Sequence, residues 1–164
     1  MTLHNGKATH TAITQEHATE LRMHVHEDLL AVIALHRPGS CHANRVVLCA
    51  AHEAPNIHGW ATSAHAACRR ASAVAMAAMQ HYQAASPPPD ALRHLLVWLA
   101  TLQGLYSKPS AVTGQLLVLD PALQQLIPPV YRPFRRPLQE LVAAVRGGRG
   151  GEGACHLQDV VGGC

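Results

Sequence analysis

Two cysteine–histidine pairs are the residues of this sequence whose types and spacing suggest chemistry. Cys49 and His52 lie three residues apart, and His65 and Cys68 repeat that spacing in reverse order after a turn at Pro55–Gly59. Residues three apart share one helix face, so two antiparallel helices would bring together two thiolates and two imidazoles, a set suited to tetrahedral zinc. However, 5 cysteines and 13 histidines make such a symmetry an expected coincidence. We therefore predict no metal and no cofactor, and keep a zinc-stabilised small helical regulatory or interaction protein as the alternative.

The sequence offers no recognisable catalytic arrangement. It contains no glycine-rich phosphate loop, no nucleophile elbow, no His-Glu-x-x-His motif and no Cys-x-x-Cys pair. His17, Glu20, His24 and Glu27 follow helical spacing, but no Glu-x-x-His pair completes a metal site of the helical-bundle type. No spacing directs an acid and a base at one substrate. We expect that the protein is not an enzyme.

The first elements that would position these residues are predicted to be helices. Apolar residues three and four apart predict a helix from about Thr14 to His36, which Pro38-Gly39 ends. Ser40 then caps a second helix that ends before the Pro55–Gly59 turn. Two such helices, folded back on each other, are the unit that helical repeat proteins stack.

The second half predicts further helices. These are an alanine-rich helix within residues 60–85, an amphipathic helix over 90–106, two short helices within 110–127, and a last helix over 138–146. Aromatic residues are only 4% of the chain and much of its apolar content is alanine, which favours helix packed on helix. The predicted fold class is all-α, with antiparallel helix pairs stacked as a short tetratricopeptide-like solenoid.

Composition also predicts the domain organisation. Residues 1–11 are polar and are expected to be flexible, and residues 12–146 form the helical-repeat domain. Residues 147–164 are rich in glycine and are predicted to be a disordered tail. A cluster of one aromatic and three basic residues precedes this tail: Tyr131, Arg132, Arg135 and Arg136. We interpret it as a solvated cluster, with docking of an acidic partner surface as the alternative.

Charge and hydropathy indicate where the protein works. The net charge of +3 and the absence of a basic stripe argue against a nucleic-acid partner. No apolar run approaches the roughly 20 residues of a membrane helix, so no membrane association is expected. The N-terminus lacks the order of a secretory signal, and the cysteines form no dense framework. These features predict a reduced, cytoplasmic protein.

One stretch resembles a known family. The run L-L-A-V-I-A-L at Leu29–Leu35, followed by Gly39 and by Cys41-His42, is similar to the N-terminal helix pair of the YscG/PscG family. These are tetratricopeptide-like cytosolic chaperones of the type III secretion needle subunit. Trp98-Leu99-Ala100 followed by Asp120-Pro121 resembles a later part of the family, and the similarity covers about half the chain.

The resemblance implies an all-helical solenoid whose concave side holds an amphipathic helix of the needle subunit. The chain would then sequester that subunit and prevent its premature polymerisation, in a heterocomplex with a second small helical co-chaperone. No cofactor is implied. The expected partner-binding residues lie on the apolar stripes: Leu29, Ile33, Leu95, Trp98, Leu99 and Leu102.

Overall fold

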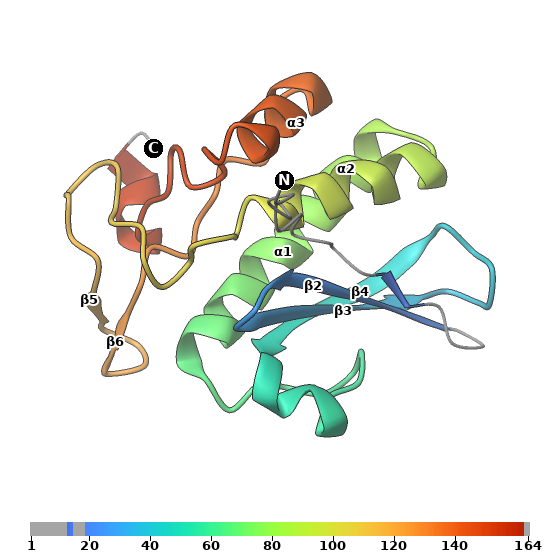
Figure 1. The fold of residues 1–164 in the computed structure, drawn as a ribbon, viewed down its shortest axis with the longest axis horizontal. Helices are drawn as coiled ribbons and strands as arrows, with labels where there is room; N and C mark the ends of the chain where they lie inside the picture. Colours follow the sequence, from blue (N-terminus) through green and yellow to red (C-terminus); the bar gives the residue numbers. More distant parts are fainter. Residues whose placement is uncertain (1–12, 15–18, 163–164) are drawn as a thin grey trace, which may run out of the picture.

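A four-stranded antiparallel meander, not a helical hairpin, forms the first third of the chain (Figure 1). The computed structural model describes residues 13–14 and 19–162, so the flexible start predicted for residues 1–11 lies outside the described residues. The elements are β1 (Ile13–Thr14), β2 (Glu20–His26), β3 (Leu29–Leu35), β4 (Ala43–Ala50), η1 (Ala51–Asn56), α1 (Ala66–Ala85), α2 (Pro88–Ala100), β5 (Val118–Asp120), β6 (Gln125–Ile127), α3 (Leu138–Arg146) and η2 (Leu157–Gly162). The prediction of an all-α solenoid is therefore wrong, because the fold is mixed α/β.

Strand β3 is the element on which the helical prediction failed. Its seven residues are all apolar and all buried. Alternate side chains point to opposite faces: Leu29, Ala31 and Ile33 join the main core, whereas Leu30 and Val32 join a smaller cluster on the other face. A run that is apolar at every position fits a helical period as well as a strand period. Here it marks a strand that is buried on both faces.

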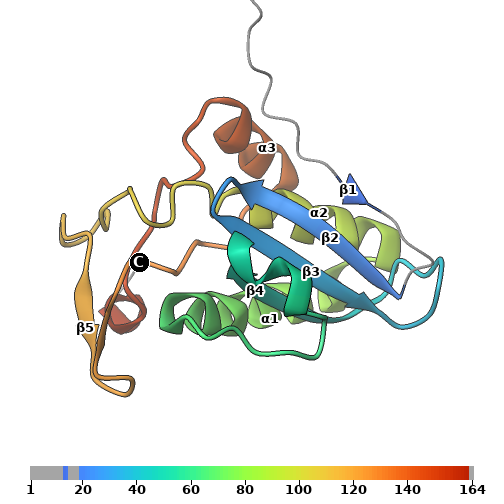
Figure 2. The same cartoon turned by 60° about the horizontal axis from the view of Figure 1, so that its bottom comes forward.

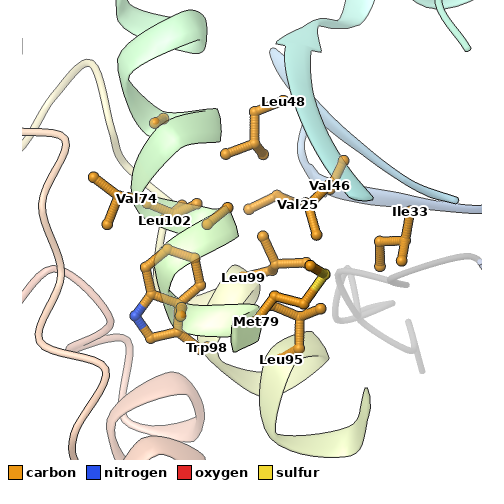
Figure 3. Packing of buried hydrophobic residues seen from close by; sticks show 14 of the residues in the cluster. Val25, Ile33, Val46, Leu48, Val74, Met79, Leu95, Trp98, Leu99 and Leu102 are labelled. Atoms are coloured by element: carbon orange, nitrogen blue, oxygen red, sulfur yellow. The ribbon is translucent and has the colours of Figure 1, made fainter. Parts of the chain in front are cut away.

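Helices α1 and α2 lie on one face of the sheet, and the 3-10 helix η1 lies on the other. Figure 2 shows η1 in front of the strands, with α1 and α2 behind them. The main core fills the space between the strands and the two helices (Figure 3). Ala71, Ala75 and Ala78 of α1 are fully buried, and their small side chains allow close approach of the helix. The alanine-rich composition thus serves packing of helices on a sheet as well as of helices on each other.

Helix α1 also closes the free edge of β4. Because β4 is the last strand of the sheet, alternate N–H groups point away from β3. The Leu48 N–H donates to Ser72 Oγ at 2.8 Å, and the Val46 N–H donates to Met76 Sδ at 3.3 Å. An open edge is a template for pairing with another chain. In this protein, side chains of α1 occupy the edge of β4.

The helices of the second half follow the predictions in part. Helix α3 spans Leu138–Arg146 as predicted. Helix α1 begins at Ala66 and α2 ends at Ala100, so both are shorter than their predicted ranges of 60–85 and 90–106. None of the described residues forms a helix long and apolar enough to cross a membrane.

The two short helices predicted within residues 110–127 are replaced by an exposed loop and the β5–β6 hairpin. The Asp120 carboxylate does accept the N–H groups of Ala122 and Leu123, as a helix cap would. The chain then adopts a positive φ of 52° at Gln124 and returns as β6. The capping signal was therefore real, but it begins a turn and not a helix.

The glycine-rich segment after α3 is packed against the rest of the molecule, although we predicted a disordered tail. Tyr131 and Cys155 exchange two backbone hydrogen bonds, of 3.1 and 3.2 Å, as an isolated antiparallel bridge. Ala154 and His156 are buried on either side of that bridge. The glycines permit tight turns that return the chain to the core.

Candidate protein-interaction surfaces

The predicted zinc ligands are only partly brought together. His52 and His65 lie side by side, with their Nε2 atoms 3.2 Å apart. Cys49 faces the smaller cluster on one side of the sheet, whereas Cys68 lies in the main core on the other side. No group of three metal-binding side chains occurs within residues 13–14 and 19–162. The zinc alternative is therefore corrected, because Cys49 points to the face of β4 opposite the core that contains Cys68 of α1.

Glu53 holds together the turn between the predicted zinc ligands. Its Oε2 accepts hydrogen bonds from the Ala50 N–H at 2.9 Å and from Ser63 Oγ at 2.7 Å, while Oε1 accepts one from the Ala64 N–H at 2.8 Å. Burial by itself raises the pKa of Glu53, but these three hydrogen bonds and the nearby His65 together lower it below its ordinary value. The ionised carboxylate thus fixes the start of α1 to the end of β4.

The two buried free cysteines, Cys49 and Cys68, are not activated thiols. Burial, the largest cause, raises the pKa of Cys49 to about 11 and also raises that of Cys68. Both are therefore protonated at neutral pH. Cys41, Cys49 and Cys68 are free thiols, and Cys155 is disulfide-bonded.

The residues predicted to bind a partner all lie in the main core. Each is at most 2% exposed: Leu29, Ile33, Leu95, Trp98, Leu99 and Leu102. Their apolar spacing correctly indicated burial. In the structure, however, they pack between the sheet and the helices and not against a partner. Their assignment to partner contact stays a prediction, and it would require the core to open.

Exposed apolar side chains gather instead on the β5–β6 hairpin and the loop before it. Leu117, Leu119 and Leu126 are 49%, 50% and 62% exposed, and Leu119 lies directly opposite Leu126 in the strand pair. Leu116 and Val112 extend this apolar surface along the loop. We call these five residues the hairpin surface. Figures 1 and 2 both place the hairpin at the periphery, away from the main sheet.

An ion pair between the partly exposed Arg70 and the buried Asp120 holds the hairpin against α1. Arg70 donates through Nε to Asp120 Oδ2 at 2.7 Å and through Nη2 to Asp120 Oδ1 at 2.8 Å. The hydrogen bonds from Arg70 lower the pKa of Asp120, and the same contact raises the pKa of Arg70. On the same hairpin, Ile127 is buried. The leucines are therefore presented by an anchored element. Sequence reasoning missed this arrangement because Leu116, Leu119, Leu123 and Leu126 also follow helical spacing.

A groove of about 740 Å³ lies between α1 and the segment 131–136. Its residues are Ala73, Val74 and Ala77 from α1, Tyr131, Pro133, Phe134, Arg135 and Arg136 from the facing segment, and Leu157 and Val160 from η2. We call it the arginine groove. Tyr131, Arg135 and Arg136 of the predicted basic-aromatic cluster thus line a groove, whereas Arg132 does not.

Arg132 is buried, not solvated, and it fixes one wall of the arginine groove from behind. Its Nη1 donates to the carbonyl oxygens of Pro129 at 2.6 Å and Tyr131 at 3.0 Å, and its Nε donates to that of Thr101 at 3.4 Å. The Trp98 indole N–H donates to the Arg132 carbonyl oxygen at 3.3 Å. Burial lowers the pKa of Arg132 to about 10, so the side chain stays charged at neutral pH.

Fold and surfaces together define a mixed α/β domain with an exposed apolar surface. Comparison with known families gives a match to the family described as Mediator complex subunit 27, over residues 57–147. The chain belongs to this family. No curated protein matches the sequence. The matched residues include α1, α2, the hairpin surface, α3 and most of the arginine groove.

Family membership overturns the resemblance to type III secretion chaperones. The L-L-A-V-I-A-L run lies outside the matched residues and forms a buried strand, so its similarity to a chaperone helix was one of apolar composition. The prediction that the chain sequesters a needle subunit together with a co-chaperone is therefore wrong. The cytoplasmic expectation is also corrected, because Mediator subunits are nuclear. Only the coarser prediction, that the partners are proteins, is confirmed.

Proposed function

We propose that this chain is a non-catalytic subunit of a Mediator-type transcription complex, and that it works in the nucleus by binding other subunits. The observation that carries this proposal is the family match over residues 57–147. That range contains exposed apolar side chains, which in a soluble protein mark contact sites for other proteins.

The hairpin surface is the contact that we assign to assembly. Its leucines lie on an element that Arg70 and Asp120 hold in place, so little conformational entropy is lost when a partner covers them. The net charge of +3 gives little attraction for a nucleic acid. We therefore expect any association with DNA to pass through other subunits.

Co-purification tests the proposal. The tagged full chain, expressed in its own cells, is recovered from nuclear extract, and Mediator subunits are quantified by mass spectrometry. We expect wild-type chain to recover several Mediator subunits. The Leu119→Ser/Leu126→Ser variant should recover at least tenfold less, because it removes exposed apolar area while leaving the buried Ile127 in place.

The control is Trp60→Ser, which removes an exposed apolar side chain that lies outside the hairpin. Circular dichroism establishes that each variant is folded. Wild-type chain that recovers no Mediator subunit would overturn the proposed function. Full recovery by the Leu119→Ser/Leu126→Ser variant would leave the family assignment intact but remove the hairpin surface from assembly.

A further inference from the structure

The three arginines of the 131–136 segment carry charge that the described part of the chain does not neutralise. No described carboxylate pairs with Arg132, Arg135 or Arg136, whereas Arg70 is paired with Asp120. Arg132 is 1% exposed, and its Nη2 has no hydrogen-bond partner among the described residues. Arg135 and Arg136 line the arginine groove, so their unpaired charge is available to carboxylates of a partner.

The walls of the arginine groove are mainly apolar. Ala73 and Ala77 lie one helical turn apart on α1, and both are exposed. Across from them, the Phe134 ring is held in contact with the rings of Trp98 and Tyr131. Methyl groups on one side and a fixed aromatic ring on the other suit the apolar face of a helix.

We propose that the arginine groove binds an amphipathic helix of a partner protein whose apolar face is flanked by Asp and Glu. The apolar face would lie between α1 and Phe134, and the flanking carboxylates would reach Arg135 and Arg136. This inference rests on the proposed function and adds the chemistry of one partner. Of the described residues that line the groove, none is acidic, so a basic helix would be repelled.

A protein helix fits these observations better than a nucleic acid. Arg132 is buried behind the wall, so only Arg135 and Arg136 are available to phosphates at the surface. Single-stranded nucleic acid is bound by longer positively charged tracks with several stacking rings. The walls here consist mainly of alkyl side chains.

Selection from a displayed peptide library tests the proposal on the full chain. The library holds 16-residue amphipathic helices with apolar residues at i, i+3, i+4 and i+7, and with flanking positions varied among Asp, Glu, Lys, Arg and Ser. We expect wild-type chain to enrich Asp and Glu at the flanking positions. The Arg135→Glu/Arg136→Glu variant should enrich Lys and Arg there instead.

Fluorescence anisotropy with the best acidic peptide then gives affinities. We expect Arg135→Glu/Arg136→Glu to weaken binding more than tenfold, and Ala77→Phe to weaken it similarly by filling the groove without a change of charge. The matched control Arg37→Glu/Arg93→Glu makes the same change of charge at two exposed arginines outside the groove. It should stay within about threefold of wild type.

Four results would overturn the proposal: no peptide enriched over background, enrichment without an acidic bias, tight binding of a dT20 oligonucleotide that depends on Arg135 and Arg136, or dimerisation that depends on them. Failure here is distinguishable from failure of the proposed function. Leu119→Ser/Leu126→Ser should keep full affinity for the acidic peptide. Recovery of Mediator subunits by a wild-type chain that selects no acidic helix would overturn the groove proposal alone.

Discussion

Ser72 shows how much one hydroxyl group decides in this fold. Its Oγ accepts the Leu48 N–H at 2.8 Å and donates to the Cys68 carbonyl oxygen at 2.7 Å. Leu48 itself is fully buried. The backbone N–H of Leu48 therefore depends on this one side chain, because water does not reach it.

Replacing Ser72 by alanine should lower the free energy of unfolding by about 1–3 kcal/mol, the usual cost of a buried donor without a partner. Urea unfolding at pH 7 measures the change. Ser107→Ala, at an exposed serine, is the control and should stay within about 0.5 kcal/mol of wild type. Equal stability of the two variants would mean that Leu48 finds another acceptor.

Some single-residue features could be read from the sequence and others could not. The turn at Pro55–Gly59 follows from its composition, and it does bring His52 and His65 together. What holds the turn is distant in sequence, because Gly59 donates its N–H to Glu20 Oε1 at 2.7 Å. The spacing of Glu20 predicts a helix face, so this contact is not predictable without knowledge of the strand.

At the scale of elements, the hairpin surface depends on the pairing of Asp120 with Arg70. The Asp120 carboxylate also accepts the N–H groups of Ala122 and Leu123, so one group both anchors the hairpin and shapes its turn. Its folded-state pKa is lowered below the ordinary value of 3.8. The stability from this group is therefore complete above pH 3.8 and is lost as pH falls through the lower folded value.

Asp120→Asn should destabilise the protein by about 2 kcal/mol at pH 7, since it removes hydrogen bonds to a charged group. The difference from wild type should shrink below pH 4, where the wild-type carboxylate becomes protonated. Urea unfolding from pH 3 to pH 7 tests both points. The pKa of Glu53 is also lowered, so Glu53 makes both proteins less stable at low pH. The test therefore compares the difference in unfolding free energy between variant and wild type at each pH. Asp90→Asn, at an exposed carboxylate, is the control and should stay within about 0.5 kcal/mol of wild type at pH 7.

Helices with a clear period were predictable, and the strands were not. Helix α3 was located correctly because prolines precede it and a glycine, Gly147, follows it. Strand β2 alternates buried and exposed residues at Met23–His26, a signal that the neighbouring apolar run concealed. Strand β3 is apolar at every position, so it has no hydrophobic period that distinguishes a strand from a helix. Only its length and the flanking turns could indicate a strand. The hairpin could not be located, because an Asp-Pro pair begins helices and turns alike.

At the scale of the whole molecule, Arg132 joins parts that are far apart in sequence. It contacts the carbonyl oxygens of Thr101 after α2 and of Pro129 before the groove wall. The bridge between Tyr131 and Cys155 attaches the C-terminal segment to the same place. The groove wall, the end of α2 and the segment around Cys155 are thus one connected unit.

Arg132→Lys should loosen this unit without unfolding the sheet, because an ammonium group lacks the planar fork that reaches several carbonyl oxygens. Hydrogen–deuterium exchange should rise more than tenfold at residues 129–134 and 153–157 and stay unchanged in β3 and β4. The control Arg135→Lys changes an exposed arginine nearby and should leave both regions unchanged. Faster exchange throughout the sheet would contradict the local role of Arg132.

The complete burial of β3 also has a consequence for biosynthesis. Leu29–Leu35 is uncharged, lacks proline and is apolar throughout, the composition of a segment that stacks into cross-β aggregates. It leaves the ribosome before α1 and α2, which cover it in the finished protein. At about 5–20 residues per second, the strand stays uncovered for several seconds. Each nascent chain therefore passes through an interval in which rapid completion of the helices, or capture by a holdase, decides between folding and aggregation.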